Sequence, residues 1–436
     1  MFKKAALLLV LFTMPYSSMA EEIIGKIQSI SIQGKVIQFI NPKTNEVSVL
    51  KFTEETKLES ADSFKDLMVN TKFKATVDDN MVAGKIKRVL VNLPKDQIIG
   101  TDELAELIES GQPLYIGDAR PKSKYDTGHI PGAKPSPASE LGNNLNWLLE
   151  DKATPLVFYC GGVTCPLSPK ALKIAKTNGY QNVRAYVDGF PAWKADVYPS
   201  HVNQEWLAKN LDIHHVILDV RTAPKSFVKG SVHLPALELV QMHEQWNKEK
   251  YPTQKRTIFT LRDKKAPITI VANSDSSDEA IEAYEILTFW KFKNVAILNE
   301  GFVGWSEAQL PVESGKIATE LNYVKKLATG AIDEKDFVNA VTSGKAMIID
   351  VRSADEASQG RLKNAMNIPL DELERHLDRI PKTGLVVLHC VGGARASLAY
   401  TALTKKGYTN VKFLDDTFED VVKENGITLL DGKSQI

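Results

Sequence analysis

The sequence predicts an α/β protein with three tandem doubly wound parallel-sheet domains, preceded by a small all-β, barrel-like domain. Three similar stretches carry this prediction, each with a short apolar run, a small-residue loop and a helical pattern. Because they recur at intervals of about one hundred residues, they indicate tandem domains and not a solenoid. A chain of 436 residues is also too long for one hydrophobic core.

The first stretch covers residues 156–165, Leu-Val-Phe-Tyr-Cys-Gly-Gly-Val-Thr-Cys. An apolar run short enough for a buried strand ends at Cys160, and a helical pattern follows within 169–179. This layout aims backbone N–H groups and a helix N-terminus at the sulfur atom, which favours anion binding and lowers a thiol pKa. The alternative for an isolated cysteine is a buried, inert side chain.

An internal repeat favours the functional interpretation of Cys160. Residues 385–395 repeat the pattern around Cys390, and both helical patterns end in Gly-Tyr-x-Asn-Val, at 179–183 and 407–411. The middle copy, at 268–274, has no cysteine. Two of the three cysteines of the chain therefore occupy equivalent places in repeated loops, which indicates that these thiols have a chemical role.

Further motifs lie near the copies, and one of them, Asp-x-Arg, precedes all three. They are Asp-x-Arg at 118–120, 219–221 and 350–352, Tyr-Asp-Thr-Gly-His-Ile-Pro-Gly-Ala at 125–133, and Gly-Phe-x-x-Trp at 189–193 and 301–305. Together these motifs resemble the rhodanese-like (sulfurtransferase) family, three times over, across roughly residues 97–430. The third copy lacks the Gly-Phe-x-x-Trp ending.

The chain divides into five predicted parts. They are a signal peptide at 1–20, a small β-barrel-like domain at 21–95, rhodanese-like domains at 96–200 and 201–315, and a helical linker (317–327) with a third rhodanese-like domain at 316–436. The β domain is predicted from short alternating strands separated by turn signals. It contains no Cys or His, so we expect a docking or structural module.

The first twenty residues predict export. Lys3 and Lys4 precede an apolar run, and small residues flank Ala20, as in a cleaved secretory signal peptide. A membrane anchor is disfavoured because the run is shorter than the roughly 20 residues of a spanning helix. We therefore expect a periplasmic or secreted protein with no membrane span in the mature chain. Equal numbers of basic and acidic residues, 54 each, disfavour nucleic acid as a partner.

The family resemblance implies sulfur transfer with Cys160 and Cys390 as the catalytic nucleophiles. A thiolate takes the outer sulfur of a donor such as thiosulfate, and a thiol or cyanide collects it from the persulfide. The expected partners are a small sulfur-containing anion and a thiol acceptor, including a periplasmic redox protein. No cofactor or metal is expected. The alternative is a non-enzymatic sulfur or oxyanion carrier that serves a redox partner.

The loop after each cysteine is the expected substrate-binding element, because glycines bring backbone N–H groups close to an anion. The expected binding residues are Gly161, Gly162, Val163, Thr164 and Cys165 in the first loop, and Gly392, Gly393, Ala394 and Arg395 in the third. Arg395 is expected to pair an oxyanion in a bidentate way. Asp118, Arg120, Asp350 and Arg352 are expected to form supporting ion pairs. Phosphate chemistry is the weaker reading, since related phosphatases have a longer loop.

Two further expectations concern the middle copy and Cys165. The middle domain is expected to be catalytically silent, because no thiol occurs at 272–274 and the carboxylates of Asp275 and Asp278 oppose anion binding. Cys165 has two interpretations: a resolving thiol for an oxidised or persulfidated Cys160, or a residue that packs into the core.

Overall fold

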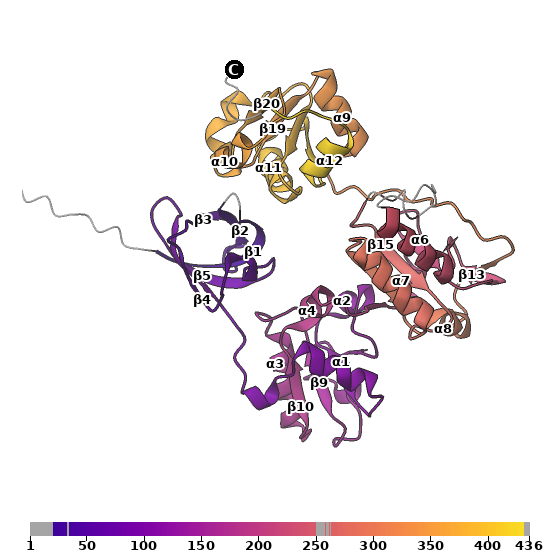
Figure 1. Ribbon diagram of the computed structural model, residues 1–436. Helices are drawn as coiled ribbons and strands as arrows, with labels where there is room; N and C mark the ends of the chain where they lie inside the picture. Colours follow the sequence, from indigo (N-terminus) through magenta and orange to yellow (C-terminus); the bar gives the residue numbers. More distant parts are fainter. Residues whose placement is uncertain (1–20, 33–34, 250–257, 259–260, 262, 431–436) are drawn as a thin grey trace, which may run out of the picture. The chain divides into compact units, whose positions relative to one another are not determined.

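The computed structural model describes residues 21–32, 35–249, 258, 261 and 263–430. The signal peptide predicted over residues 1–20 lies outside them. The chain forms two compact units. One contains the N-terminal part up to Leu90 and the part from Leu327 onward, and the other spans Val91–Lys326. Figure 1 shows the N-terminal β domain and the three α/β domains.

The N-terminal domain is a six-stranded sheet with the order β3-β2-β1-β5-β6-β4. Its strands are β1 (Glu21–Ser31), β2 (Val36–Ile40), β3 (Val47–Lys51), β4 (Lys57–Glu59), β5 (Lys72–Val77) and β6 (Ala83–Arg88). Alternate residues of β5 are buried, and Phe39 meets Phe73 edge to face in the core. The predicted all-β domain is confirmed. Its described strands pair as an open sheet, however, and a single bridge between Lys51 and Val82 takes the place of barrel closure.

The first α/β domain has a parallel sheet with the order β10-β9-β7-β8. Its elements are β7 (Tyr115–Asp118), β8 (Lys134–Pro135), β9 (Leu156–Tyr159), β10 (Val183–Tyr186), α1 (Thr101–Glu109), α2 (Lys122–Thr127), α3 (Leu167–Thr177) and α4 (Gly189–Ala195). All residues of β7 and β9 are buried, as expected for strands covered on both faces. Phe158 packs into one apolar cluster and Val157 into another, because successive side chains of a strand point to opposite faces.

The second α/β domain repeats this arrangement with the order β11-β16-β15-β12-β14. Its sheet strands are β11 (His201–Val202), β12 (Val216–Asp219), β14 (Val232–His233), β15 (Pro267–Val271) and β16 (Asn294–Leu298). Its helices are α5 (Gln204–Ala208), α6 (Ala236–Glu249), α7 (Asp278–Phe289) and α8 (Gly301–Glu307). A separate antiparallel pair joins β13 (Ser226–Val228) to β17 (Val312–Ser314).

The third α/β domain has the order β18-β22-β21-β19-β20. Its strands are β18 (Ala331–Ile332), β19 (Met347–Asp350), β20 (Ala365–Asn367), β21 (Val386–His389) and β22 (Val411–Leu414). Its helices are α9 (Glu334–Ser343), α10 (Ala354–Ser358), α11 (Ala394–Lys405) and α12 (Phe418–Glu424), with the 3-10 segment η5 (Leu370–Arg379). The prediction of three tandem parallel-sheet domains is confirmed.

The helical linker predicted at 317–327 is wrong, because this segment forms no helix. It runs along the second domain, where Leu321 and Tyr323 pack against the apolar cluster of that domain. The Val324 N–H also donates to the carbonyl oxygen of Ile213 at 2.8 Å. Contacts with the domain surface therefore outweigh the helical pattern of the segment.

Candidate functional site

The Asp-x-Arg motifs form the same buried ion pair in all three domains. The Arg Nε to Asp Oδ1 distances are 2.9 Å for Arg120–Asp118, 3.0 Å for Arg221–Asp219 and 2.9 Å for Arg352–Asp350. Each guanidinium also donates to a backbone carbonyl of the segment that follows, on Gly128, Ser226 and Gly360. Because both partners are committed to each other and to the backbone, the geometry is that of a supporting pair.

A backbone hydrogen bond next to each motif fixes where the central strand ends. The residue after the Asp donates its N–H to the last residue of the neighbouring strand: Ala119 to Tyr159 at 2.9 Å, Val220 to Val271 at 3.0 Å, and Val351 to His389 at 3.0 Å. Cys160, Ala272 and Cys390 each follow that acceptor by one residue. The three loops therefore start at equivalent positions, and alanine stands at the cysteine position of the second domain.

The loop of the third domain places Cys390 beside the start of α11. Cys390 follows β21 and is 2% exposed. Gly393 has a φ of +89°, and a Cβ there would lie 2.7 Å from Oδ1 of Asp415, so the turn requires glycine. α11 begins at Ala394 with no side-chain cap and no acidic residue in its first turn. Its first N–H groups lack partners within the helix, which makes the loop favourable for an anion.

Arg395 does not have the partner that we expected. Its Nη1 and Nη2 donate to the two carboxylate oxygens of Glu356, at 2.6 and 2.8 Å, and both side chains are buried. Glu356 also closes a capping box with Ser353 at the start of α10. Arg395 therefore fixes the loop against α10, and its bidentate partner is a protein carboxylate and not a substrate oxyanion. Sequence reasoning missed Glu356, although Ser-x-x-Glu at 353–356 is a recognisable capping signal.

The loop of the first domain differs from the expected cradle. Cys160 is fully buried, and its sulfur lies 3.3 Å from the carbonyl oxygen of Cys165 and 3.2 Å from Oγ of Ser168. A hydrogen bond with the Cys165 side chain, together with burial, raises the pKa of Cys160, where we expected a lowered value. The Cys165 N–H is also committed to the carbonyl oxygen of Gly162, at 2.8 Å. Ser168, the second residue of α3, is a contact that sequence reasoning missed.

The loop of the second domain holds its own carboxylate. Oδ2 of Asp275 accepts the Glu300 N–H at 2.7 Å and lies 3.4 Å from Nδ1 of His201. α7 carries two further acidic residues in its first turn, Asp278 and Glu279. These negative charges disfavour an anion at the start of α7. The catalytic silence of this domain stays a prediction.

The histidine before Cys390 is buried in the core. His389 is the last residue of β21 and stacks on Phe418 with ring centroids 4.2 Å apart. Its Nε2 lies 3.9 Å from Oδ2 of Asp350. Burial lowers the pKa of His389 to about 4, so the ring is neutral near pH 7.

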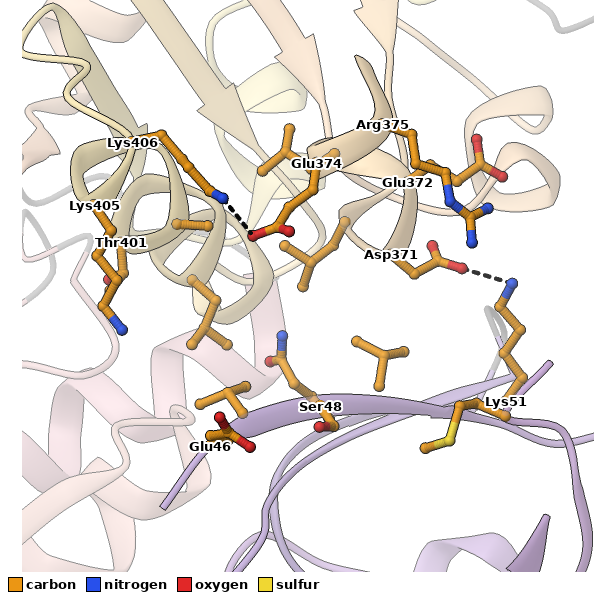
Figure 2. Close-up of a pocket in the computed structure, with 18 of the residues that line it drawn as sticks. Glu46, Ser48, Lys51, Asp371, Glu372, Glu374, Arg375, Thr401, Lys405 and Lys406 are labelled. Carbon is orange, nitrogen blue, oxygen red and sulfur yellow. Dashed lines mark ion pairs between the residues drawn. The ribbon is translucent and has the colours of Figure 1, made fainter. Parts of the chain in front are cut away.

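Figure 2 shows a pocket in the unit that contains the third domain. Cys390 is not one of its lining residues. β3, η5 and α11 contribute to its lining. Nζ of Lys51 lies 2.6 Å from Oδ2 of Asp371, and Nζ of Lys406 lies 3.8 Å from Oε1 of Glu374. Two lysines of the lining are therefore paired with two carboxylates of the lining.

The described residues hold neither a membrane-spanning helix nor a metal cluster. None of their helices has the length and apolar character needed to cross a membrane. Nor do they contain a cluster of three or more His, Cys, Asp or Glu side chains suited to a metal ion.

Comparisons with known proteins agree with the repeated architecture. A family model described as the rhodanese-like domain matches residues 100–196, 203–308 and 333–424. An HTH-type transcriptional regulator of Mycobacterium tuberculosis is 37% identical over 101 residues, which cover 23% of this chain and 42% of the relative. A sulfurtransferase of Allochromatium vinosum is 32% identical over 65 residues, covering 15% of this chain and 61% of the relative. The matches thus span less than two thirds of these relatives.

Two solved structures are similar to parts of this chain. A thiosulfate sulfurtransferase from Pseudomonas aeruginosa has a TM-score of 0.22 and 18% identity, over 74% of this chain and 67% of that chain. A rhodanese-like domain from Anabaena has a TM-score of 0.23 and 26% identity, over 24% of this chain and 79% of that chain.

Proposed function

Because this chain belongs to the rhodanese-like domain family, with three such domains in tandem, we propose that it is an exported sulfurtransferase. It moves sulfane sulfur from a donor such as thiosulfate to a thiol or cyanide acceptor through a cysteine persulfide. The observation that carries the proposal is the Cys390 loop. A thiol there lies at the end of a central strand and beside an uncapped helix start with no acidic residue in its first turn.

The roles of the residues follow from this geometry. The Cys390 thiolate attacks the outer sulfur of the donor, sulfite leaves, and the persulfide stays within reach of the N–H groups of the loop. Gly393 supplies the turn, and the Arg395–Glu356 pair holds the loop in place. In the first domain the Cys160 thiol accepts sulfur in the same reaction class. Export places this chemistry in the periplasm or outside the cell.

The test is the thiosulfate-dependent formation of thiocyanate from cyanide by the full chain. Wild type should turn over many times, and a chain with Cys160→Ser, Cys165→Ser and Cys390→Ser should show only the uncatalysed rate, because a persulfide needs a thiol. Restoring Cys390 alone should return a large share of the activity. Equal rates for wild type and the cysteine-free chain would exclude the proposal. Stoichiometric sulfur uptake without turnover would instead identify a carrier.

A further inference from the structure

The first and second α/β domains are joined by backbone hydrogen bonds inside one compact unit, Val91–Lys326. The N–H groups of His129 and His201 each donate to the carbonyl oxygen of the other residue, at 2.9 Å. The N–H of Asn203 donates to the carbonyl oxygen of Asp126 at 3.0 Å. The segment that follows α2 in the first domain therefore lies directly beside β11 of the second domain.

A pocket of about 340 Å³ lies where these two domains meet. This volume falls within the range of small-molecule sites, about 300–1,000 Å³. The first domain contributes residues of α2 and α4 to the lining, and the second domain contributes the first residues of β15 and β16. Cys160 is not one of the lining residues, so the pocket is distinct from the thiol loop of the first domain.

The charged side chains of the lining are all cations, namely Arg120, Lys124 and Lys194, and its described residues include no Asp or Glu. Arg120 is already paired with Asp118, so it adds little net charge. Asp126 is the acidic residue of α2, and it is paired within that helix. Lys124 and Lys194 form no ion pair with any described residue. The uncompensated positive charge of the pocket therefore comes from these two lysines.

Lys194 is held in place although its charge has no counterion. Its Nζ donates to the carbonyl oxygen of Lys293 in the second domain, at 2.9 Å, so the ammonium group reaches across the joint. The side chain is partly buried, and this burial lowers the pKa of Lys194, as expected for an ammonium group with no carboxylate beside it. The ammonium group has further N–H donors, and no described residue accepts from them.

The wall that the second domain supplies adds no negative charge. Trp206 and His215 contribute to it, together with the first residues of β15 and β16. Burial lowers the pKa of His215 to about 4, so its ring is neutral near pH 7. The pocket in Figure 2 differs, because its lining includes the carboxylates of Asp371 and Glu374. The charge of the pocket between the two domains therefore favours an anion.

We propose that this pocket binds a small tetrahedral oxyanion with two negative charges, held by Lys124 and Lys194. Sulfate, phosphate and thiosulfate share this chemistry. Two cations in one partly enclosed pocket favour a dianion over chloride, because each additional charge on the ligand adds Coulomb energy. The site needs no thiol, so it is independent of the sulfur transfer proposed above. It also gives the second domain a role as one wall of a binding site.

The test is acetylation of the full chain with an N-hydroxysuccinimide ester, read for each lysine by mass spectrometry. Sodium sulfate should slow the reaction of Lys124 and Lys194 by about threefold or more relative to sodium chloride at equal ionic strength, because a neighbouring anion favours the unreactive ammonium form. Lys173 and Lys176 are exposed lysines of α3 outside the pocket, and they should react equally fast in both salts. Phosphate and thiosulfate are tested in the same way, and the strongest protection identifies the preferred oxyanion.

Two variants of Ala296 test whether the second domain forms part of the site. Ala296 lines the pocket from β16 and is partly exposed. Ala296→Asp places a carboxylate in the pocket and should abolish protection by sulfate, because like charges repel. Ala296→Asn adds a side chain of nearly the same size without the charge, and protection should persist. Circular dichroism checks that both variants are folded.

Two results would overturn the inference. One is an equal effect of sulfate on the two pocket lysines and on the two lysines of α3 in the wild-type chain. The other is an equal effect of sulfate in the Ala296→Asp and Ala296→Asn chains. Because acetylation requires no thiol, either result leaves the proposed function to its own test, the formation of thiocyanate.

Discussion

At the scale of single residues, His389 links the stability of the third domain to pH. Burial lowers its pKa from 6.5 to about 4 in the folded chain. The unfolded chain therefore binds a proton below about pH 6.5, whereas the folded chain resists until about pH 4. The contribution of neutral His389 to the free energy of unfolding is fully present above the pKa of the unfolded chain, about 6.5. It is lost as the pH falls from there to about 4, by about 3 kcal/mol in total.

The measurement is the urea dependence of Cys390 exposure to dithiodipyridine, in a chain with Cys160→Ser and Cys165→Ser so that one thiol reports. Between pH 6.5 and 4, the unfolding free energy should fall more steeply with His389 than with His389→Gln. Parallel pH curves for the two chains would show that His389 does not carry the effect.

The hydrogen-bond partners of individual side chains could not be predicted from the sequence. The strand, loop and helix around Cys160 and Cys390 were predicted from apolar runs and glycines, and they are present. The pairing of Arg395 with Glu356 was missed, because the two lie far apart in sequence and only the fold brings them together. The pattern also left open whether Cys160 is buried, since a sequence pattern does not show which way a loop thiol turns.

At the scale of elements, the start of α4 supports the Cys160 loop. Gly189 has a φ of +65°, and a Cβ there would lie 2.5 Å from the carbonyl oxygen of Cys160 and 2.7 Å from the Gly162 nitrogen. Gly189→Ala should therefore displace the loop. We expect a loss of about 1–3 kcal/mol in stability and slower sulfur uptake by the first domain, measured by calorimetry and by mass spectrometry of the Cys160 peptide.

Gly111→Ala is the matched control for this element. Gly111 has nearly the same φ, +64°, but a Cβ there meets nothing within 4 Å. It carries the backbone strain without the clash, so sulfur uptake should stay near that of wild type. Equal loss of uptake in both variants would show that α4 does not position the loop.

Elements were predicted well where local pattern and tertiary packing agree. The buried strands and the helices after each loop satisfy both requirements. The linker at 317–327 does not, since its apolar residues are used to cover the second domain and not to form a helix face. The β domain shows the same limit, because alternation predicts strands but does not specify whether the outer strands pair with each other.

At the scale of the whole molecule, the second domain provides a test of what makes a loop active. Ala272 occupies the cysteine position. Asp275 lies in the loop that follows, and Asp278 and Glu279 are in the first turn of α7. In a chain without the natural cysteines, Ala272→Cys alone should take up little sulfur from thiosulfate. Adding Asp275→Ser, Asp278→Ser and Glu279→Ala should raise uptake by about tenfold or more, because charge repulsion is relieved.

The control neutralises three exposed carboxylates elsewhere, with Glu285→Gln, Glu307→Gln and Glu320→Gln. This changes the net charge equally but leaves the loop charges in place, so uptake should stay low. Strong uptake by Ala272→Cys without neutralisation would show that the missing thiol, and not charge, keeps the domain silent.

The backbone hydrogen bond beside each Asp-x-Arg motif has a consequence for how the sequence of such a chain can change in evolution. The bond fixes the start of each loop through main-chain atoms and makes no demand on the side chains that follow. The sheet can therefore carry loops of different length, charge and thiol content while the arrangement of its strands stays the same. Copies of one scaffold can acquire separate chemistries, or lose chemistry altogether, while each retains the same strands.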